Sequence, residues 1–96
     1  MRWIESYVHK SKVGVLIEIE TGNALATSTD EFRRLARDLV LHIAGCKPAS
    51  IEEVLGQPFI KKPNASVSRR IQEVSAQINS PIRVIRFVRY DVTDTP

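Results

Sequence analysis

Two histidines and one cysteine are the side chains of this sequence that support the widest range of chemistry. His9 lies in a β-branched stretch near the start, and His42 and Cys46 lie in an apolar segment of the middle third. The histidines do not fall into a set of thiols, imidazoles and carboxylates with the spacing of a zinc site. We therefore expect no metal ion and no other cofactor, and we interpret His42 as a partly buried helix residue.

Glu18 and Glu20 are two carboxylates that a strand would place on the same face. Such a pair serves as general acid and base only inside a cleft, and solvated strand charges are the more common case. The sequence contains neither a Gly-rich phosphate loop nor a nucleophile elbow. These observations favour a binding module over an enzyme.

The composition is typical of one small globular domain spanning residues 1–96. The chain is 43% apolar and 26% charged, within the ordinary range for globular proteins. It has no apolar run of 18 residues and no amino-terminal signal pattern. We expect no membrane contact and a cytoplasmic location. A single cysteine agrees with a reducing compartment, and we expect Cys46 to be a buried thiol at a helix end.

The positive charge is concentrated in the last third of the chain. Fourteen basic and eleven acidic residues give a net charge of +3. Five arginines of this region allow two interpretations, a basic patch for nucleic acid or a solvated face with salt bridges: Arg69, Arg70, Arg83, Arg86 and Arg89. The second interpretation is favoured because stacking aromatic residues are few, so nucleic acid is an unlikely partner.

An amphipathic helix over residues 28–46 is the element that must organise the core. Ser28 and Glu31 have the spacing of a capping box. Apolar residues then recur every three or four positions, which puts them on one helix face: Phe32, Leu35, Ala36, Leu39, Val40 and Ile43. Gly45 and Pro48 are expected to end the helix.

The other segments predict a small antiparallel sheet and a second long helix. Residues 3–9 and 13–20 have strand patterns and are joined at Ser11 and Lys12, which predicts a hairpin. A loop is expected over residues 21–27, a short helix after Ser50 and an extended segment at 57–60. Ser66 should cap a second helix that ends at residues 79–81, before a strand at 82–92 and a frayed tail at 93–96. The predicted fold class is α+β, with two main helices packed on one face of a three-stranded antiparallel sheet.

Four segments, taken in order, resemble the core domain of the elongation factor Ts family. Each matches a family motif, and together they cover most of the chain: Ser6-Tyr7-Val8-His9 with Lys12-Val13-Gly14-Val15-Leu16, Glu31-Phe32 through Asp38 to His42-Ile43-Ala44, Gln57-Pro58-Phe59-Ile60-Lys61, and Arg86-Phe87-Val88-Arg89. The resemblance implies a protein that binds elongation factor Tu and helps it to release GDP. It also implies partner contacts at the hairpin, with Tyr7 and His9, and at the bend before the last strand, with Ile78 and Asn79.

The chain departs from the family pattern at the partner-binding wedge. The family's Thr-Asp-Phe-Val motif, whose aromatic side chain enters the partner, falls on four smaller residues: Asn23, Ala24, Leu25 and Ala26. This difference resembles the second, degenerate core subdomain of long members. The family's amino-terminal helical module and the long insertion between residues 48 and 57 are also missing. We therefore expect weak or lost exchange activity, although residues 23–26 should still face the partner.

A self-association module is the alternative function. The strand expected at residues 82–92 would pair edge to edge with a second copy of the chain and form a homodimer.

Overall fold

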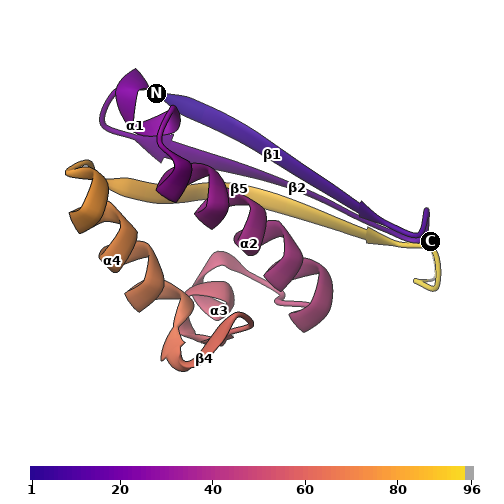
Figure 1. Ribbon diagram of the computed structural model, residues 1–96. Helices are drawn as coiled ribbons and strands as arrows, with labels where there is room; N and C mark the ends of the chain where they lie inside the picture. The colour runs from indigo at the N-terminus through magenta and orange to yellow at the C-terminus, as the bar shows by residue number, and fades with distance from the viewer. Residues whose placement is uncertain (95–96) are drawn as a thin grey trace.

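The computed structural model of the protein describes residues 1–94, and it has the predicted α+β architecture. Strands β1 (Arg2–His9), β2 (Val13–Thr21) and β5 (Ile82–Asp91) form an antiparallel sheet in the order β1-β2-β5. The helices cover one face of this sheet, as Figure 1 shows. The expectation of a three-stranded sheet roofed on one side is confirmed.

The hairpin between β1 and β2 turns at Lys10 and Ser11, which both have positive φ angles (52° and 59°). The Lys12 N–H closes the turn on the His9 carbonyl at 2.9 Å. In the resulting register Tyr7 lies opposite Val15 and His9 opposite Val13. Tyr7 and His9 therefore belong to the same end of the sheet.

The long helix α2 (Asp30–Cys46) ends at the predicted residue but begins two residues later, and the residues that cap it differ from the predicted ones. Thr29, and not Ser28, is its N-cap, because the Thr29 hydroxyl accepts the Phe32 N–H at 3.2 Å. Ser28 instead donates its hydroxyl to the Leu25 carbonyl. Gly45 lies inside the helix, and Lys47 adopts the left-handed C-cap conformation with φ of 50°.

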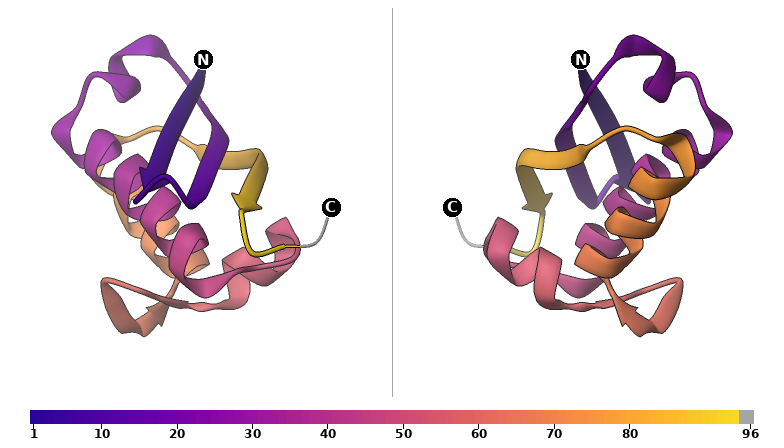
Figure 2. Two further views of the ribbon diagram at one scale, coloured as in Figure 1. Left: turned by 90° about the vertical axis from the view of Figure 1, so that its right-hand side faces the viewer. Right: turned by 90° about the vertical axis from the view of Figure 1, so that its left-hand side faces the viewer.

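The core lies between the sheet and two long helices. Val15, Ile17 and Ile19 of β2 are buried against α2 and belong to one core cluster with residues of α4 (Val67–Ile78). The six predicted apolar residues of α2 are all buried, as are three on α4, Val67, Ile71 and Val74. Figure 2 shows α2 and α4 side by side on the same side of the sheet.

Four short elements complete the fold. The loop predicted at residues 21–27 contains a single helical turn, α1 (Ala24–Thr27), which the sequence analysis missed. The short helix expected after Ser50 is α3 (Ile51–Gly56), and the extended segment that follows is β3 (Pro58–Phe59). Strand β3 pairs with β4 (Lys62–Ser66), which the sequence did not predict because Pro63 and Asn64 are poor strand residues.

The bend between α4 and β5 packs against the loop that follows β2. Ser66 caps α4 as predicted, and Asn79 ends it in the left-handed conformation with φ of 52°. The Gly22 N–H donates to the Ser80 hydroxyl at 2.9 Å, and a Cβ at Gly22 would lie 3.0 Å from Pro81 Cδ. A side chain at Gly22 would therefore crowd Pro81 and Ser80, so glycine suits this close approach of the two segments.

Part of the tail that was expected to fray is ordered. Thr93 donates its N–H and its hydroxyl to Asp91, at 2.9 and 2.7 Å, and residues 95–96 lie outside the described residues. Among residues 1–94, no helix combines the length and the apolar character that crossing a membrane requires.

Candidate functional site

The residues expected to contact a partner lie at the two ends of the three-stranded sheet. Tyr7 and His9 lie at the turn between β1 and β2, and the other six follow β2 or end α4 at the opposite end: Asn23, Ala24, Leu25, Ala26, Ile78 and Asn79. The nine residues of β2 separate the two groups, a distance of about 30 Å at strand rise. The fold therefore makes two separate candidate contact regions.

At the hairpin end, Tyr7 and His9 form a polar pair. The Tyr7 hydroxyl and His9 Nδ1 are 2.7 Å apart, and the Arg37 guanidinium lies 5.9 Å from the Tyr7 ring centroid. The His9 side chain is exposed, whereas Tyr7 is half-buried. The pair is thus held at the surface by neighbours that belong to two different elements.

Beside this pair lies a mainly apolar groove of about 330 Å³. We call it the hairpin groove. It lies between the hairpin, the end of α2 and the turn joining β3 to β4, and its lining residues are Tyr7, His9, Val13, Leu41, Ala44, Gly45, Ile60 and Lys61. An apolar hollow with a few polar groups at its rim is a typical binding feature.

At the opposite end, the helical turn α1 presents Leu25 to solvent. Leu25 is 79% exposed, whereas Ala26 is buried and packs inward. The Asn23 side chain accepts the Ala26 N–H at 3.0 Å and so caps the turn. Asn79 is exposed and Ile78 half-buried, and the bond between Gly22 and Ser80 joins their bend to this loop.

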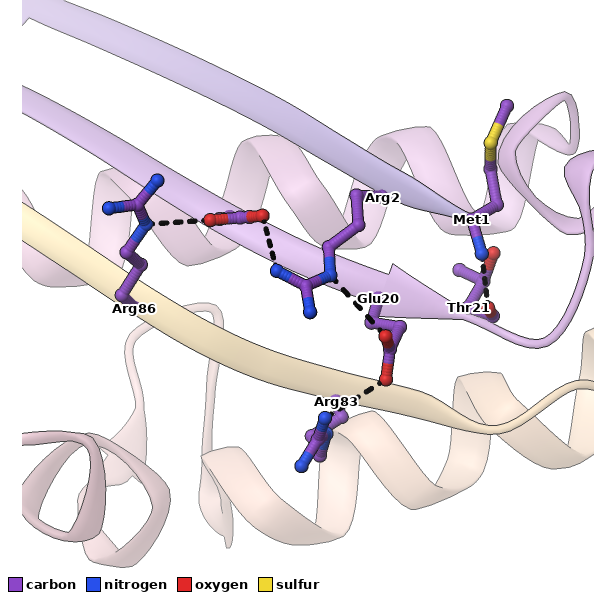
Figure 3. A network of polar contacts seen from close by, with 7 residues as sticks. Met1, Arg2, Glu20, Thr21, Arg83 and Arg86 are labelled. Atoms are coloured by element: carbon purple, nitrogen blue, oxygen red, sulfur yellow. Dashed lines mark hydrogen bonds and ion pairs between the residues drawn. The ribbon is translucent and has the colours of Figure 1, made fainter.

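The outer face of the sheet carries a ladder of ion pairs (Figure 3). Glu18 accepts from Arg2 at 2.8 Å and from Arg86 at 2.6 Å, and Glu20 accepts from Arg2 at 3.3 Å and from Arg83 at 3.1 Å. Hydrogen bonds from Arg2 and Arg86 lower the pKa of Glu18, and a hydrogen bond from Arg83 is the main cause of the lowered pKa of Glu20. These contacts keep both carboxylates ionised and occupied, so they do not form an acid and base pair.

The ladder corrects one detail of the sequence interpretation. Glu18 was expected to be a solvated charge, but it is only 9% exposed because two guanidinium groups cover it. The predicted salt bridges of the five arginines are confirmed, since each has an acidic partner within 4 Å. The predicted solvated face does not include Arg89, which is half-buried and donates to the Ala44 carbonyl. The partners are Glu18 for Arg86, Glu20 for Arg83, Asp91 for Arg89, and Glu73 for both Arg69 and Arg70.

Apolar side chains continue the outer face next to the ladder. Ile4, Leu16 and Val88 come from three adjacent strands and remain exposed. Together with Glu18 and Arg86 they line a shallow hollow of about 370 Å³. Helices cover only the opposite face of the sheet, so this hollow is open to solvent in the single chain.

The structure changes the interpretation of His42 and Cys46. His42 was expected to be partly buried, but it is completely buried and bonded to the segment that follows α3. Cys46 was expected to be buried, but it is exposed because α2 extends beyond the core at its last turn. Within residues 1–94, no three metal-ligating side chains come together.

The network around His42 is a feature that the sequence reasoning missed. His42 and Gln57 are 15 positions apart, so their contact depends on how the chain returns after α3. The only indication in the sequence was that His42 and Gln57 both belong to the family motifs quoted above.

Comparison with known proteins finds relatives named elongation factor Ts. An elongation factor Ts of Rubrobacter xylanophilus is 27% identical over 135 residues, covering 93% of this chain and 69% of the relative. One of Thermodesulfovibrio yellowstonii is 26% identical, covering 96% of the chain and 68% of the relative. One of Nostoc sp. is 32% identical over 92 residues, covering 95% of the chain but only 29% of that longer protein. No protein-family model matches the chain.

The lengths of these alignments are consistent with the expectation that the chain lacks a long insertion present in some relatives. The alignment of 135 positions includes 93% of the 96 residues, or about 89, so that relative carries about 46 residues that the chain lacks. The Nostoc alignment of 92 positions needs no comparable addition. The chain therefore matches a compact segment of that larger protein, and the resemblance seen in the motifs is confirmed over nearly its whole length.

Proposed function

We propose that this elongation factor Ts-like chain binds elongation factor Tu in the cytoplasm and promotes the release of GDP from it during translation elongation. The observation that carries the proposal is the match to elongation factors Ts over 93 to 96% of the chain. His9, the histidine that the family motif assigns to partner contact, supports it by being exposed beside the hairpin groove. The activity would be exchange of a bound nucleotide and not catalysis of a chemical reaction.

We further propose that the exchange activity is weak. The position of the family's aromatic wedge is held by Leu25, which is exposed but offers less surface than phenylalanine. Loss of a buried aromatic anchor typically costs about 2 kcal/mol or more, which lowers affinity by about thirtyfold.

The test follows labelled GDP leaving elongation factor Tu of the same organism after the chain is added. We expect stimulated release, and His9→Ala should reduce both release and complex formation. Val8→Ala is the matched control, because Val8 is the neighbouring exposed residue on the same strand. Absence of both a complex and stimulated release with the unaltered chain would contradict the proposal.

A gain of function provides the complementary test. The double variant Ala24→Asp with Leu25→Phe restores the carboxylate and the aromatic ring of the family motif on an exposed helical turn. We expect it to increase GDP release by tenfold or more, about 1.4 kcal/mol of added transition-state stabilisation. Equal release by the variant and the unaltered chain would show that α1 does not face the nucleotide site.

Self-association is the second candidate, and the position of β5 favours it. Among the described strands, β5 has β2 on one side and no strand on the other, and Val88 and Tyr90 remain exposed on it. Exposed edge strands of this kind pair readily with a second copy. Light scattering at low micromolar concentration should then show a dimer, which Tyr90→Lys should weaken. A monomer that captures elongation factor Tu would exclude this candidate.

A further inference from the structure

His42 contacts three residues of the segment that follows α3: Gln57, Phe59 and Ile60. Its ring lies in α2 and is completely buried. Nδ1 accepts the Ile60 N–H at 3.2 Å, Nε2 lies 2.8 Å from Gln57 Oε1, and the ring stacks on Phe59 with centroids 6.0 Å apart. Because Nδ1 accepts an N–H, it carries no proton, so Nε2 is the nitrogen that donates to Gln57.

A second contact from the same helix face continues this attachment. Asp38 lies one turn before His42 and pairs with Lys61 at 3.9 Å. Side chains of α2 therefore hold Gln57, Phe59, Ile60 and Lys61. Elsewhere the segment is held by the burial of Phe59 in the core and by the Gln57 carbonyl, which accepts the Val67 N–H at 2.9 Å. The pairing at Ile60 itself is short, since β3 has two residues and its register with β4 shifts between Pro58 and Phe59.

This attachment determines one wall of the hairpin groove. Ile60 and Lys61, from the turn between β3 and β4, line the groove together with Tyr7 and His9 of β1. Ile60 also rests on the helix, because a Cβ at Gly45 would lie 3.1 Å from Ile60 Cδ1. A displaced Ile60 would therefore change the width of the groove beside His9.

We propose that His42 is a positioning residue: by accepting the Ile60 N–H, it holds the turn after β3 at the distance from Tyr7 and His9 that binding elongation factor Tu requires. This inference rests on the proposed function. His42 is buried and does not touch the partner, so it acts only through Ile60 and its neighbours.

Two conservative variants separate the two nitrogens of the ring. Asparagine places an acceptor near the position of Nδ1, and glutamine places a donor near the position of Nε2. His42→Asn therefore keeps an acceptor for Ile60 and loses the bond to Gln57. His42→Gln keeps the bond to Gln57 and loses the acceptor, and both variants lose the stacking on Phe59.

The first readout needs no partner. We expect the Ile60 amide to exchange with solvent about tenfold faster in His42→Gln than in His42→Asn, since only the asparagine variant keeps a hydrogen-bond acceptor for this amide. A scalar coupling across the hydrogen bond, between the Ile60 amide nitrogen and His42 Nδ1, should be present in the unaltered chain. That measurement decides the geometry even if neither variant folds, and a missing coupling would overturn the proposal.

The second readout is affinity for GDP-loaded elongation factor Tu. His42→Gln should bind at least tenfold more weakly than His42→Asn, with similar thermal stability in the two variants. Losses of affinity that follow stability alone would reduce His42 to a structural residue and overturn the proposal. If the unaltered chain binds no elongation factor Tu while the amide exchange behaves as expected, the proposed function fails and the positioning of Ile60 by His42 stands.

Discussion

Glu18 shows how a single side chain joins the two outer strands of the sheet. It sits on the central strand and accepts one guanidinium from each neighbour, Arg2 of β1 and Arg86 of β5. The hydrogen bonds that lower its pKa also link strands that do not pair directly. The ladder should therefore stabilise the sheet most when Glu18 is ionised.

The stability of the protein should accordingly fall in acid. Because folding lowers the pKa of Glu18, its contribution is complete above the ordinary glutamate pKa of about 4.3 and disappears as pH falls through the lowered value. Glu18→Gln should reduce the free energy of unfolding at pH 7 and flatten its decrease between pH 5 and pH 3. Urea unfolding across that range provides the measurement.

Glu52→Gln is the matched control for this acid effect. Glu52 is exposed on α3 and makes no side-chain hydrogen bond or ion pair with the rest of residues 1–94. Substitution of Glu52 should leave the pH dependence of the free energy of unfolding unchanged. A profile for Glu18→Gln that runs parallel to that of the unaltered protein would exclude the ladder as the source of acid sensitivity.

Among the secondary-structure elements, α2 is capped by Thr29 and Lys47, whereas the sequence predicted Ser28 and Gly45 at its two ends. Ser28 satisfied the capping-box spacing with Glu31, but α1 uses the Ser28 N–H and hydroxyl for its own last turn. Thr29 is left to cap α2, and its hydroxyl also donates to the Ala26 carbonyl. A missed helical turn thus moved the predicted start of the next helix.

We expect Thr29→Ala to destabilise the protein by about 1 kcal/mol, the usual cost of losing an N-cap. Ser28→Ala is the natural comparison, because its exposed hydroxyl serves only the Leu25 carbonyl. It should cost about 0.5 kcal/mol or less. Thermal unfolding of the two variants distinguishes them, and the reverse order of stability would restore Ser28 as the cap.

The other end of α2 offers a stabilising change. Lys47 is exposed and adopts the left-handed conformation, which costs a side chain about 1 to 2 kcal/mol. Lys47→Gly removes that cost, but the greater freedom of glycine in the unfolded chain destabilises the folded state by about 0.5 to 1 kcal/mol. We therefore expect the free energy of unfolding to rise by about 0.5 kcal/mol. Asn79→Gly should gain less, since asparagine tolerates this conformation. A loss of stability in Lys47→Gly would contradict the assignment.

These elements show what sequence patterns can predict here. Apolar periodicity placed both long helices, and alternation placed the hairpin and the last strand, because those patterns follow directly from which faces are buried. The turn α1 and the strand β4 were missed because they depend on contacts with distant residues, such as Gln57 accepting the Val67 N–H. The burial of His42 has the same cause.

The candidate site was only partly predictable for a related reason. The motifs proposed Tyr7, His9 and residues 23–26 as candidate contacts, but the separation of the two groups along β2 appears only in the folded chain. The hairpin groove depends on Ile60 and Lys61, which are more than 40 residues away from β1 in the sequence. Periodicity carries no information about such contacts.

At the scale of the whole molecule, the two candidate regions lie at opposite ends of an elongated body measuring 42 by 27 by 20 Å. If elongation factor Tu contacts both, it must cover the length of the sheet. Residues so far apart share no neighbours, so their effects on binding should be independent.

This independence can be measured with variants at each end. His9→Ala and Leu25→Ala should each weaken binding to elongation factor Tu, and the double variant should lose the sum of the two free energies within about 0.5 kcal/mol. Binding measured by calorimetry gives the three values. A double variant no weaker than one of the single variants would mean that only one end touches the partner.

The exposed end of α2 makes the protein suitable for attaching a reporter dye. Cys46 is the single cysteine of the 96 residues, and its sulfur lies 3.8 Å from His42 Nδ1, close to the segment that forms the groove wall. A maleimide fluorophore would react at one defined position without any substitution. Its emission would then follow occupancy of the groove in real time.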